Sequence, residues 1–328
     1  MRAARVLQLA GPGGIEVTDD VPEPEIRTDM LLIDAHAAGV SFPDLLLSQG
    51  LYQIKLDPPF TLGSECAGTV EVAADGSGFE VGQPVISFTS VGAFADTVAA
   101  PVQSTVPLPE GLTMAEGAGL IMNYHTAHFA LVRRGGLETG ETLLIHGAGG
   151  GVGTAATQVA KGLGARVLAV ASDEGKRQAA TDAGADEVID GKGEWREQVK
   201  ELTDGRGVDA VFDPVGGDRF DESLKVMAPE GRLIVIGFAS GRIPSVTVNR
   251  LLFRNTSVVG AAWGHFALER PEYFKQVAAD LERMVADGFV KPLLGKRYPL
   301  AKVSAALADL EGRQAIGKIV LDIKEAEE

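Results

Sequence analysis

Residues 143–159, LIHGAGGGVGTAATQVA, carry five glycines within seven positions, between an apolar run and an amphipathic one. Glycine at this density costs backbone entropy, so the chain must need a bare and tightly turned backbone there. The apolar run 142–146 is typical of a strand and residues 152–163 are typical of a helix, so the glycines form the turn between them. A dinucleotide pyrophosphate binds at such a turn, where backbone N–H groups meet the positive end of a helix.

The turn has the spacing of the G-x-G-x-x-G dinucleotide fingerprint, with Ala148 in the first glycine position. Gly150 lets the pyrophosphate approach the backbone, and Gly153 lets the helix pack closely on the strand. Gly151 and Val152 complete the expected cofactor-binding set. The alternative is a glycine-rich turn without a ligand, but six strand-like runs in the right order favour the dinucleotide site.

The chain has two parts of different texture. Residues 1–118 hold short runs punctuated by glycine and proline, which predicts an all-β unit of short antiparallel strands. Residues 119–265 alternate apolar runs with helical stretches, and runs that are apolar on both faces indicate parallel strands buried between helix layers. This part predicts a doubly wound α/β sheet. A last strand over 317–323 can pair in either part.

Composition argues against several classes of function. A net charge of −15 and a pI near 4.8 argue against the basic face that a nucleic-acid site needs. The single cysteine, Cys66, excludes an intramolecular disulfide and a multi-thiolate zinc site. No apolar stretch reaches the ~18–20 residues of a membrane span, and the N-terminal apolar run stops at Gly11, too early for a signal peptide. We expect a cytoplasmic protein with no membrane insertion and no nucleic-acid partner.

The end of the second strand of the sheet bears on the choice of cofactor. An NAD site carries Asp or Glu there, about 20 residues past the glycines, for the ribose 2′-hydroxyl. Here the strand over 165–170 runs into Ala171 and Ser172, with Lys176 just beyond. A hydroxyl and a cation suit a 2′-phosphate, which predicts NADP(H) with Ser172 and Lys176 as ligands. Two alternatives remain open: Ser172 or Asp173 N-caps the next helix, and a small register shift places Asp173 at the acidic position.

Several motifs in order along nearly the whole chain resemble the medium-chain dehydrogenase/reductases, and specifically their zinc-free, ζ-crystallin-like quinone oxidoreductase branch. These are AGVSFPDLLLSQGLY, LGSECAGTV, MNYHTAHFAL, HGAGGGVGTAATQVAKGLGARV, GVDAVFDPVGG and NTSVVGAAWG. The resemblance implies a GroES-like catalytic domain over 1–118, completed by 266–328, and a Rossmann domain over 119–265. It also implies NADPH in a cleft between them and homodimers through the edge strand of the Rossmann sheet, near 255–262.

Two positions depart from the zinc-dependent relatives. Those enzymes have a cysteine ligand where this chain has Ser41 and a histidine ligand where it has Ser64, and they carry a four-cysteine lobe that this chain lacks. Serine is a poor zinc ligand, so we expect no zinc, and alcohol oxidation without a Lewis acid is disfavoured. Quinone reductases often have asparagine at the first position, and Ser41 is kept as a candidate catalytic residue.

Tyr52 is the main catalytic candidate. It matches a tyrosine that lines the active-site cleft of these relatives, and the tyrosine at this position is a proton donor in enoyl-thioester reductases of the same superfamily. A phenol can protonate an enolate after hydride delivery, or hydrogen-bond a quinone oxygen. The alternative is an aromatic side chain packed at a domain interface with its hydroxyl in water. Asp44 precedes Tyr52 on the same expected helix, where capping fits better than catalysis.

The resemblance also implies that Asn123 and Thr126 contact the cofactor. They lie in the segment whose threonine approaches the nicotinamide, and positions 123 and 126 share one helix face. The alternative is ordinary helix packing. His125 and His128 share another face, but without a third ligand they do not make a metal site.

The remaining candidates follow strands of the sheet or lie in the C-terminal tail. Ligands of doubly wound sheets bind at the carboxyl ends of the strands. Gly237, Phe238 and Ala239 follow such a strand and are expected along the nicotinamide half of the cofactor. Trp263 follows the last strand, either as a wall of the same cleft or as an interface or core aromatic. Arg313 matches an arginine that reaches an NADPH phosphate, and the alternative is a surface arginine.

Together these residues predict a zinc-independent NADPH:quinone oxidoreductase. Its acceptor is a small quinone or conjugated carbonyl compound, reduced by one electron or by two. The first alternative is reduction of an activated alkene, an enone or an enoyl thioester, with Tyr52 as proton donor. The second alternative is an NADPH-binding structural or regulatory protein without turnover, since a fold alone does not prove an active site.

Overall fold

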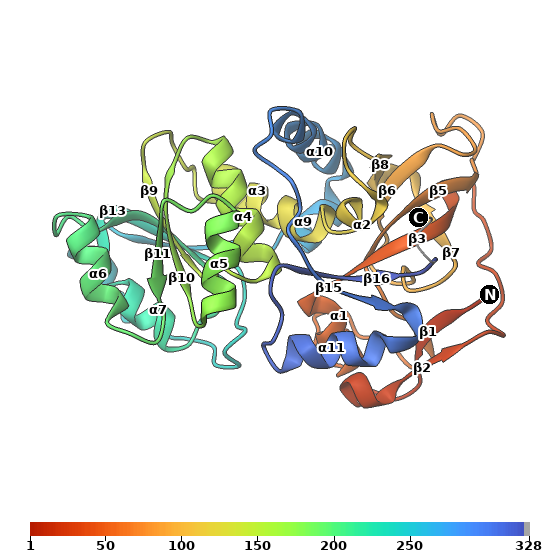
Figure 1. The fold of residues 1–328 in the computed structure, drawn as a ribbon, viewed down its shortest axis with the longest axis horizontal. Helices are drawn as coiled ribbons and strands as arrows, with labels where there is room; N and C mark the ends of the chain where they lie inside the picture. Colours follow the sequence, from red (N-terminus) through yellow and green to blue (C-terminus); the bar gives the residue numbers. More distant parts are fainter. Residues whose placement is uncertain (325–328) are drawn as a thin grey trace. The chain divides into compact units, whose positions relative to one another are not determined.

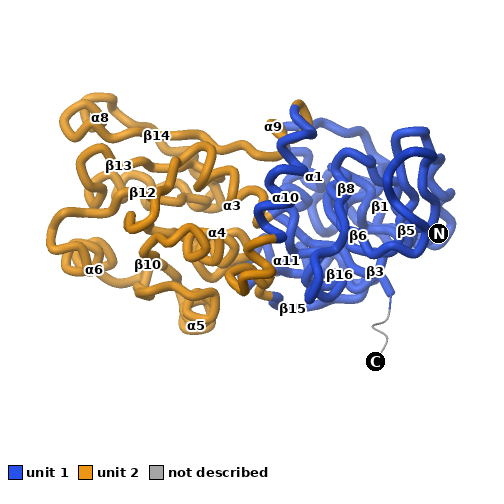
Figure 2. The backbone as a smooth tube through the Cα atoms, turned by 90° about the horizontal axis from the view of Figure 1, so that it is seen from above, with its two compact units in different colours: residues 1–122, 270–282, 294–328 blue, residues 123–269, 283–293 orange. Residues whose placement is uncertain are grey.

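The computed structural model describes residues 1–324, and the chain divides into two compact units (Figure 2). The first unit comprises residues 1–122, 270–282 and the chain from 294 onward. The second unit comprises residues 123–269 and 283–293. Each unit therefore includes part of the C-terminal third of the chain. Of the tail from 266 that is expected to complete the first part, residues 266–269 and 283–293 belong to the second unit.

The second unit contains a six-stranded parallel sheet (Figure 1). Its strands are β9 (Thr142–His146), β10 (Arg166–Ala171), β11 (Glu187–Asp190), β12 (Val208–Asp213), β13 (Met227–Val235) and β14 (Ser257–Gly260). The strand order is β11-β10-β9-β12-β13-β14, with parallel pairing throughout, and β12 is buried along its whole length. This confirms the doubly wound sheet. Its order reverses between β9 and β12, and ligands of such sheets bind at that point, beyond the carboxyl ends of the strands.

Helices connect these strands. They are η3 (Ile121–His125), α3 (Thr126–His128), η4 (Phe129–Arg134), α4 (Gly151–Gly162), α5 (Glu174–Asp182), α6 (Trp195–Leu202), α7 (Asp218–Ser223), α8 (Asn249–Leu252) and α9 (Trp263–Glu269). The segments η3 and η4 are π-helical and flank the short α3. Residues 121–134 thus form one continuous helical segment with two wider stretches, a feature often found at functional sites.

The first unit is built on two sheets. The larger has the order β15-β16-β3-β5-β6-β8, with β7 also paired to β3, and the smaller has the order β2-β1-β4. The strands are β1 (Ala3–Val6), β2 (Ile15–Thr18), β3 (Met30–Val40), β4 (Phe60–Thr61), β5 (Glu65–Val72), β6 (Pro84–Phe88), β7 (Thr97–Pro101), β8 (Thr105–Pro107), β15 (Leu294–Pro299) and β16 (Lys318–Asp322). Because β16 pairs antiparallel with β3, the last strand, whose pairing the sequence left open, belongs to the first unit.

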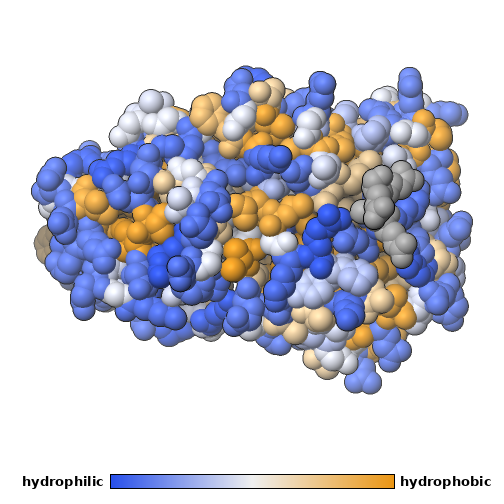
Figure 3. All heavy atoms as spheres, in the orientation of Figure 1, coloured by the Kyte–Doolittle hydropathy of each residue, from blue (hydrophilic) through white to orange (hydrophobic). Residues whose placement is uncertain are grey.

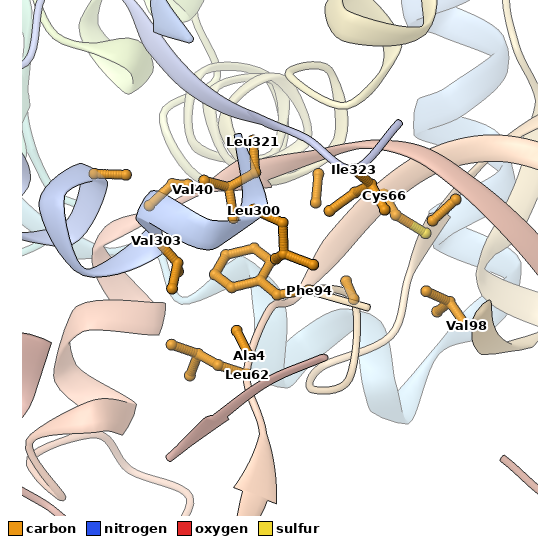
Figure 4. Packing of buried hydrophobic residues seen from close by; sticks show 14 of the residues in the cluster. Ala4, Val40, Leu62, Cys66, Phe94, Val98, Leu300, Val303, Leu321 and Ile323 are labelled. Carbon is orange, nitrogen blue, oxygen red and sulfur yellow. The ribbon is translucent and has the colours of Figure 1, made fainter. Parts of the chain in front are cut away.

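The C-terminal segment also completes the core of the first unit. Phe94 is fully buried and packs in a cluster with Leu62 from the N-terminal part and Leu300 and Val303 from the tail (Figure 4). The helices of this unit are η1 (Gly11–Gly14), α1 (Phe42–Ser48), η2 (Val102–Ser104), α2 (Met114–Gly117), α10 (Pro271–Ala286), which runs on into the second unit, η5 (Leu300–Lys302) and α11 (Val303–Glu311). The N-terminal strands therefore depend on residues more than two hundred positions away to exclude water from their core.

The surface is largely hydrophilic on the face that Figure 3 shows, in keeping with the net charge of −15. In the second unit, the segment before β14 exposes several large apolar side chains: Ile243, Val248, Leu252 and Phe253 are each at least 71% exposed. Within residues 1–324, no helix is long and apolar enough to cross a lipid bilayer.

Candidate functional site

The glycine turn between β9 and α4 is shaped by a close approach of backbone to backbone. Gly147 has φ +62°, in the left-handed region that favours glycine. A Cβ added to Gly153 would lie 2.3 Å from the carbonyl oxygen of Gly147, so α4 packs directly on the turn and only glycine fits. A Cβ added to Gly150 would meet only that same oxygen, at 3.5 Å. The packing role predicted for Gly153 is confirmed, and the backbone at Gly150 has open space beside it.

The amino end of α4 has the features that an anionic group requires. The helix is twelve residues long, begins after the N-cap Gly150, and no side chain caps it. The N–H groups of Gly151, Val152 and Gly153 therefore have no helical acceptors and lie at the positive end of the helix dipole. The amide of Ala148 donates to the end of β10 at 3.2 Å, which ties the turn to the sheet. These residues fit a dinucleotide pyrophosphate.

Ser172, Asp173 and Lys176 form a polar group at the end of β10. The Oδ1 atom of Asp173 accepts a hydrogen bond from the Lys176 amide at 3.0 Å, so Asp173, and not Ser172, is the N-cap of α5. That hydrogen bond is the main reason why the pKa of Asp173 lies below its ordinary value. Ser172 Oγ donates to Asp173 Oδ2 at 3.1 Å, and Lys176 Nζ lies 3.2 Å from the same oxygen. The capping alternative is thus confirmed for Asp173.

This polar group lies beside the glycine turn. A Cβ added to Gly149 would come within 2.4 Å of the Lys176 carbonyl oxygen, so the first turn of α5 packs directly on the glycines. The structure therefore brings together two features that are separated by more than twenty residues in the sequence. The Ser172 hydroxyl and the Lys176 ammonium thus belong to a segment whose backbone contacts the glycine turn, an arrangement that suits a 2′-phosphate near a pyrophosphate.

Asp213, at the carboxyl end of β12, is a residue that the sequence interpretation missed. It is 1% exposed, and its Oδ1 accepts hydrogen bonds from the amides of Val215 and Gly216, both at 2.9 Å. The loop shaped in this way packs on the glycine turn, since a Cβ on Gly147 would lie 3.4 Å from the Val215 side chain. It also holds the segment after β13, whose Ala239 amide donates to the loop at 3.0 Å. The available signal was an Asp ending a strand directly before Pro-Val-Gly-Gly.

His146 supports the turn from within the sheet. Its Nε2 lies 2.7 Å from Ser223 Oγ, and since that hydroxyl donates to the Arg219 carbonyl oxygen at 2.6 Å, it accepts from the imidazole. The ring packs edge-on against Trp195, with centroids 5.0 Å apart. Burial lowers the pKa of His146 to about 3, so the imidazole is neutral. Its role is to anchor the end of β9 to the helices that cover it.

Asn123 and Thr126 are the two residues of 121–131 that are not buried. Asn123 lies in the π-helical η3 and Thr126 opens α3, so the uninterrupted α-helix from which their shared face was predicted is not what the structure contains. Their common exposure is an independent reason to treat them as a pair. Both present partly accessible polar side chains from a segment that is otherwise interior.

Trp263, at the start of α9, is a buried residue of the second unit. It is 1% exposed, and its ring packs edge-on against His125, with centroids 5.2 Å apart. Burial lowers the pKa of His125 to about 3, so this histidine packs as a neutral aromatic ring. With so little accessible surface, Trp263 fits the alternative of an interface or core aromatic better than the wall of an open cleft.

The other cofactor candidates lie in loops. Gly237, Phe238 and Ala239 follow β13, at the same carboxyl edge of the sheet as the glycine turn, and Phe238 is 38% exposed. Arg313 lies in the first unit, exposed in the turn between α11 and β16, with φ +55°. The structure therefore connects 237–239 to the turn through the Asp213 loop, and it leaves Arg313 on a surface turn.

Ser41 lies in a buried charged network of the first unit. Its Oγ accepts a hydrogen bond from Lys318 Nζ at 2.6 Å and donates to Glu65 Oε1 at 3.2 Å. Lys318 also donates to Glu65, and the two side chains are only 4% and 1% exposed. The catalytic role expected of Ser41 stays a prediction. The residue is 5% exposed, and its hydroxyl forms these hydrogen bonds within the protein.

Asp44 lies beside this network and is completely buried. Its Oδ2 accepts a hydrogen bond from the Ser41 amide at 2.8 Å at the start of α1, so the predicted capping role is confirmed. Burial raises the pKa of Asp44 to about 7, against the opposing effects of the Ser41 amide and the Lys318 ammonium. The carboxyl group is therefore partly protonated near neutral pH.

Tyr52 lies in the turn that follows α1, not on the helix as expected, because α1 ends at Ser48. Its amide donates to the Leu46 carbonyl oxygen at 3.2 Å, and its ring is half-buried against the core of the first unit. Burial, and secondarily the Asp44 carboxylate, raise the pKa of Tyr52 above its ordinary value. The phenol therefore keeps its proton at neutral pH.

The residues at positions 41 and 64 do not fit a zinc ion. A cation bound to Ser41 Oγ would face the buried ammonium of Lys318, which already donates to that oxygen. Serine hydroxyls are also poor zinc ligands beside thiolate and imidazole. Among the residues that the structure describes, no group of three or more His, Cys, Asp or Glu side chains is placed to hold a metal.

Two family models match the chain. Residues 27–110 match the alcohol dehydrogenase GroES-like domain, and residues 151–283 match the zinc-binding dehydrogenase family. The first match lies in the first unit, and the second begins at the first residue of α4.

Proteins similar over the whole length are also known. The rat quinone oxidoreductase is 34% identical over 325 residues, which cover 98% of this chain and 97% of the relative. A probable oxidoreductase from Mycobacterium abscessus has a TM-score of 0.91 and 42% identity, and the match covers 98% of both chains. A mycobacterial protein solved in complex with NADPH has a TM-score of 0.90 and 37% identity, over 98% of this chain and 99% of that one.

We expect Gly153→Ala to destabilise the protein, because the new methyl group would collide with the Gly147 carbonyl oxygen. The free energy of unfolding should fall by about 1–3 kcal/mol, as for overpacking at a rigid site. Gly150→Ala, in the same turn, is the matched control and should change it by less than about 0.5 kcal/mol. Denaturant unfolding measures both variants, and equal losses would contradict the packing difference between the two glycines.

The raised pKa of Asp44 predicts a pH-dependent cost of folding. Because the folded carboxyl holds its proton up to about pH 7, against an ordinary pKa of 3.8, its contribution to stability is greatest at low pH and is lost as the pH rises through this window. Asp44→Asn cannot ionise and keeps an oxygen for the Ser41 amide. Relative to wild type, the variant should gain stability between about pH 4 and pH 7, by on the order of 4 kcal/mol, and then level off.

Thermal unfolding of both proteins across this range measures the difference. Asp75→Asn, in an exposed turn, is the control and should show no such trend. A stability difference between Asp44→Asn and wild type that does not change with pH would refute the raised pKa.

Proposed function

Because the chain belongs to the medium-chain dehydrogenase/reductase family, among the quinone oxidoreductases, we propose that it transfers a hydride from NADPH to a quinone without zinc. The observation that carries this proposal is the uncapped end of α4 at the glycine turn, beside the hydroxyl and ammonium that follow β10. It is supported by a similar protein solved with NADPH and by a relative named quinone oxidoreductase. The acceptor would be a small quinone or conjugated carbonyl compound, and the protein would act in the cytoplasm.

In this proposal the pyrophosphate of the cofactor binds the backbone N–H groups of Gly151, Val152 and Gly153. The open space at Gly150 lets it approach, and Ala148 supports the turn from the side of β10. This arrangement needs no side-chain charge, because the helix end supplies the positive potential.

Ser172 and Lys176 would bind the 2′-phosphate. The Lys176 ammonium would turn from Asp173 to the phosphate, a change that Asp173 tolerates because it keeps its hydrogen bond from the Lys176 amide. Asp173 would stay the cap of α5, so the acidic side chain is occupied by the helix and is not available to a ribose hydroxyl. This favours NADP(H) over NAD(H).

The nicotinamide half would lie along Gly237, Phe238 and Ala239. These residues are tied to the glycine turn by the Asp213 loop, and they follow the strand next to β12. Asn123 and Thr126 would bind its polar groups from their half-buried positions. Trp263 would contribute only by packing against His125. Arg313 would add a positive charge near a phosphate of the cofactor.

The bound cofactor would supply the hydride, and the chain's own residues would bind, orient and shield it. Tyr52 keeps its phenolic proton at neutral pH, since burial and Asp44 raise its pKa. It would hydrogen-bond an acceptor oxygen and stabilise the negative charge that develops there. Zinc independence rests on the Lys318 ammonium, which donates a hydrogen bond to Ser41 Oγ and so occupies a lone pair that a metal would need.

Reduction of an activated alkene is the second candidate, and the protonated phenol of Tyr52 favours it. An alkene needs a proton on carbon after hydride addition, whereas the oxygens of a reduced quinone exchange protons readily with water. The two reactions therefore differ in how much they depend on Tyr52.

We also propose that the protein forms a homodimer through β14. This strand is the edge of its sheet, so one side of its backbone has no partner strand among residues 1–324. The segment before it exposes Leu252 and Phe253 at 71% and 80%. An open sheet edge beside exposed apolar side chains is a surface that pairs readily with a second copy.

The function is tested by NADPH oxidation with 1,4-benzoquinone, 9,10-phenanthrenequinone, an enone and crotonyl-CoA, with NADH as the control cofactor. We expect turnover with the quinones and NADPH. Tyr52→Phe should lower alkene reduction by ~10²–10⁴-fold and quinone reduction by less than about tenfold. Alkene turnover that exceeds quinone turnover and collapses in this variant would favour the second candidate. Binding of NADPH with no oxidation by any acceptor would favour a structural or regulatory role.

Lys176→Ala, in the same assay, tests the 2′-phosphate site. Loss of a charged hydrogen-bond donor should lower the preference for NADPH over NADH, measured as the ratio of kcat/KM values, by about 10–100-fold. Lys192→Ala, an exposed lysine near the end of β11, is the control and should leave the ratio unchanged. A preference unaltered by Lys176→Ala would rule this residue out as the phosphate ligand.

The dimer is tested by sedimentation. Phe253→Asp should convert a dimer into monomers, because a charge would be buried in the interface. Val81→Asp, at a 71% exposed position in the first unit, is the matched control and should leave the mass unchanged. A wild-type protein that sediments as a monomer at micromolar concentration contradicts the proposal.

A further inference from the structure

The buried pair of Glu65 and Lys318 joins three segments that are far apart in the sequence. Glu65 uses its two oxygens separately: Oε1 accepts from Lys318 Nζ and from Ser41 Oγ, and Oε2 accepts from the Met122 amide at 2.8 Å. Lys318 also donates to Ser41 Oγ at 2.6 Å. One carboxylate and one ammonium, almost inaccessible to water, thus fix the start of α1, the start of η3 and the start of β16.

Each of these segments leads to a candidate site residue. Ser41 precedes α1, whose carbonyl at Leu46 accepts from the amide of Tyr52. Met122 is the immediate neighbour of Asn123 in η3. Lys318 opens β16, five residues after Arg313. Tyr52, Asn123 and Arg313 are far apart in the sequence. What they have in common is that the segment leading to each is attached to this ion pair.

We propose that Glu65 and Lys318 are positioning residues, whose buried ion pair sets the directions of the three segments and thereby the geometry of hydride transfer. This inference rests on the proposed function for the reaction that it affects. Neither residue touches the cofactor or the acceptor in this assignment. They act through Ser41 and through the Met122 amide.

The chemistry of the ion pair indicates that it orients these segments more than it stabilises the fold. Burying two charges costs desolvation that their attraction does not reliably recover, so an apolar pair of similar volume often folds at least as well. An apolar pair would, however, leave the Met122 N–H without its acceptor. The backbone also makes room for the carboxylate: a Cβ on Gly39 would lie 2.6 Å from Glu65 Oε1 and 2.1 Å from the Ala118 carbonyl oxygen.

Two double variants separate the hydrogen bonds from the charge. Glu65→Gln/Lys318→Met removes both charges but keeps an amide oxygen for Met122. Glu65→Leu/Lys318→Met removes both charges and that acceptor. Both avoid a buried unpaired charge, so both should fold, with melting temperatures within roughly 5 °C of wild type. The matched control is Glu141→Gln/Arg232→Met, an ion pair of the second unit that is not connected to Glu65 or Lys318.

Three quantities are measured on each protein. They are the steady-state kinetics with NADPH and 1,4-benzoquinone, the primary deuterium isotope effect with NADPH labelled at the transferred position, and the rate of amide exchange at Met122. For the leucine double variant we expect kcat to fall by about 10–100-fold, as for a small misplacement of reacting groups, with the KM for NADPH changed less than about threefold. Its isotope effect should rise, because hydride transfer becomes slower, and Met122 exchange should rise at least about tenfold. The glutamine variant should keep Met122 protection and lose less activity.

Wild-type kcat and isotope effect in the folded leucine variant would overturn the inference, and so would an equal loss of kcat in the Glu141→Gln/Arg232→Met control. Double variants that do not fold would also overturn it, because a pair that folding requires is structural. A wild type without quinone turnover would refute the proposed function alone. In that case amide exchange at Met122 would still decide whether the pair holds this segment. If the Met122 amide stays protected from exchange in the leucine variant, the inference is overturned. If the protection is lost in the leucine variant but kept in the glutamine variant, the inference is supported.

Discussion

The close approach of α4 to its own preceding turn is the constraint on which the second unit depends. A strand that passes into a helix within a few residues brings the helix almost onto the strand end, and at Gly153 this leaves no room for a Cβ. The same approach directs the uncapped N–H groups of α4 toward the carboxyl edge of the sheet. Asp213 then holds the turn from the side of β12. A packing requirement and an anion-binding surface thus arise from the same few atoms.

The first unit is organised by buried charge instead. Asp44, Glu65 and Lys318 are each at least nine-tenths buried, and Ser41 lies among them. Charged groups are tolerated in such a place only when hydrogen bonds replace the lost water, and each of these groups has at least one short contact to backbone or side chain. Helix α1 and Tyr52 take their positions from this network. The two units therefore present their candidate residues by different physical means.

Much of the fold and part of the site followed from local patterns. The six parallel strands were recognisable because strands buried on both faces lack polar alternation, and Gly153 because the fingerprint spacing demands a small residue there. The partners of Ser41 and Trp263 could not be predicted from such local patterns. The first is buried by a lysine 277 residues away, and the second packs against a histidine on another helix. Asp213 was missed because its role is to hold two loops, and the Asp before Pro-Val-Gly-Gly does not by itself show which loops it holds.

The sequence by itself determined the strand–turn–helix unit, the class of each part of the chain and the place where an anionic cofactor meets backbone, because glycine spacing and apolar periodicity act over a few residues. Only the tertiary structure decided which polar groups lose contact with water and which partners they then find. Desolvation and ion pairing depend on neighbours that folding collects from distant parts of the chain, such as residues 41, 65, 122 and 318. That is why the sequence could single out Ser41 as a candidate but could not show its partners.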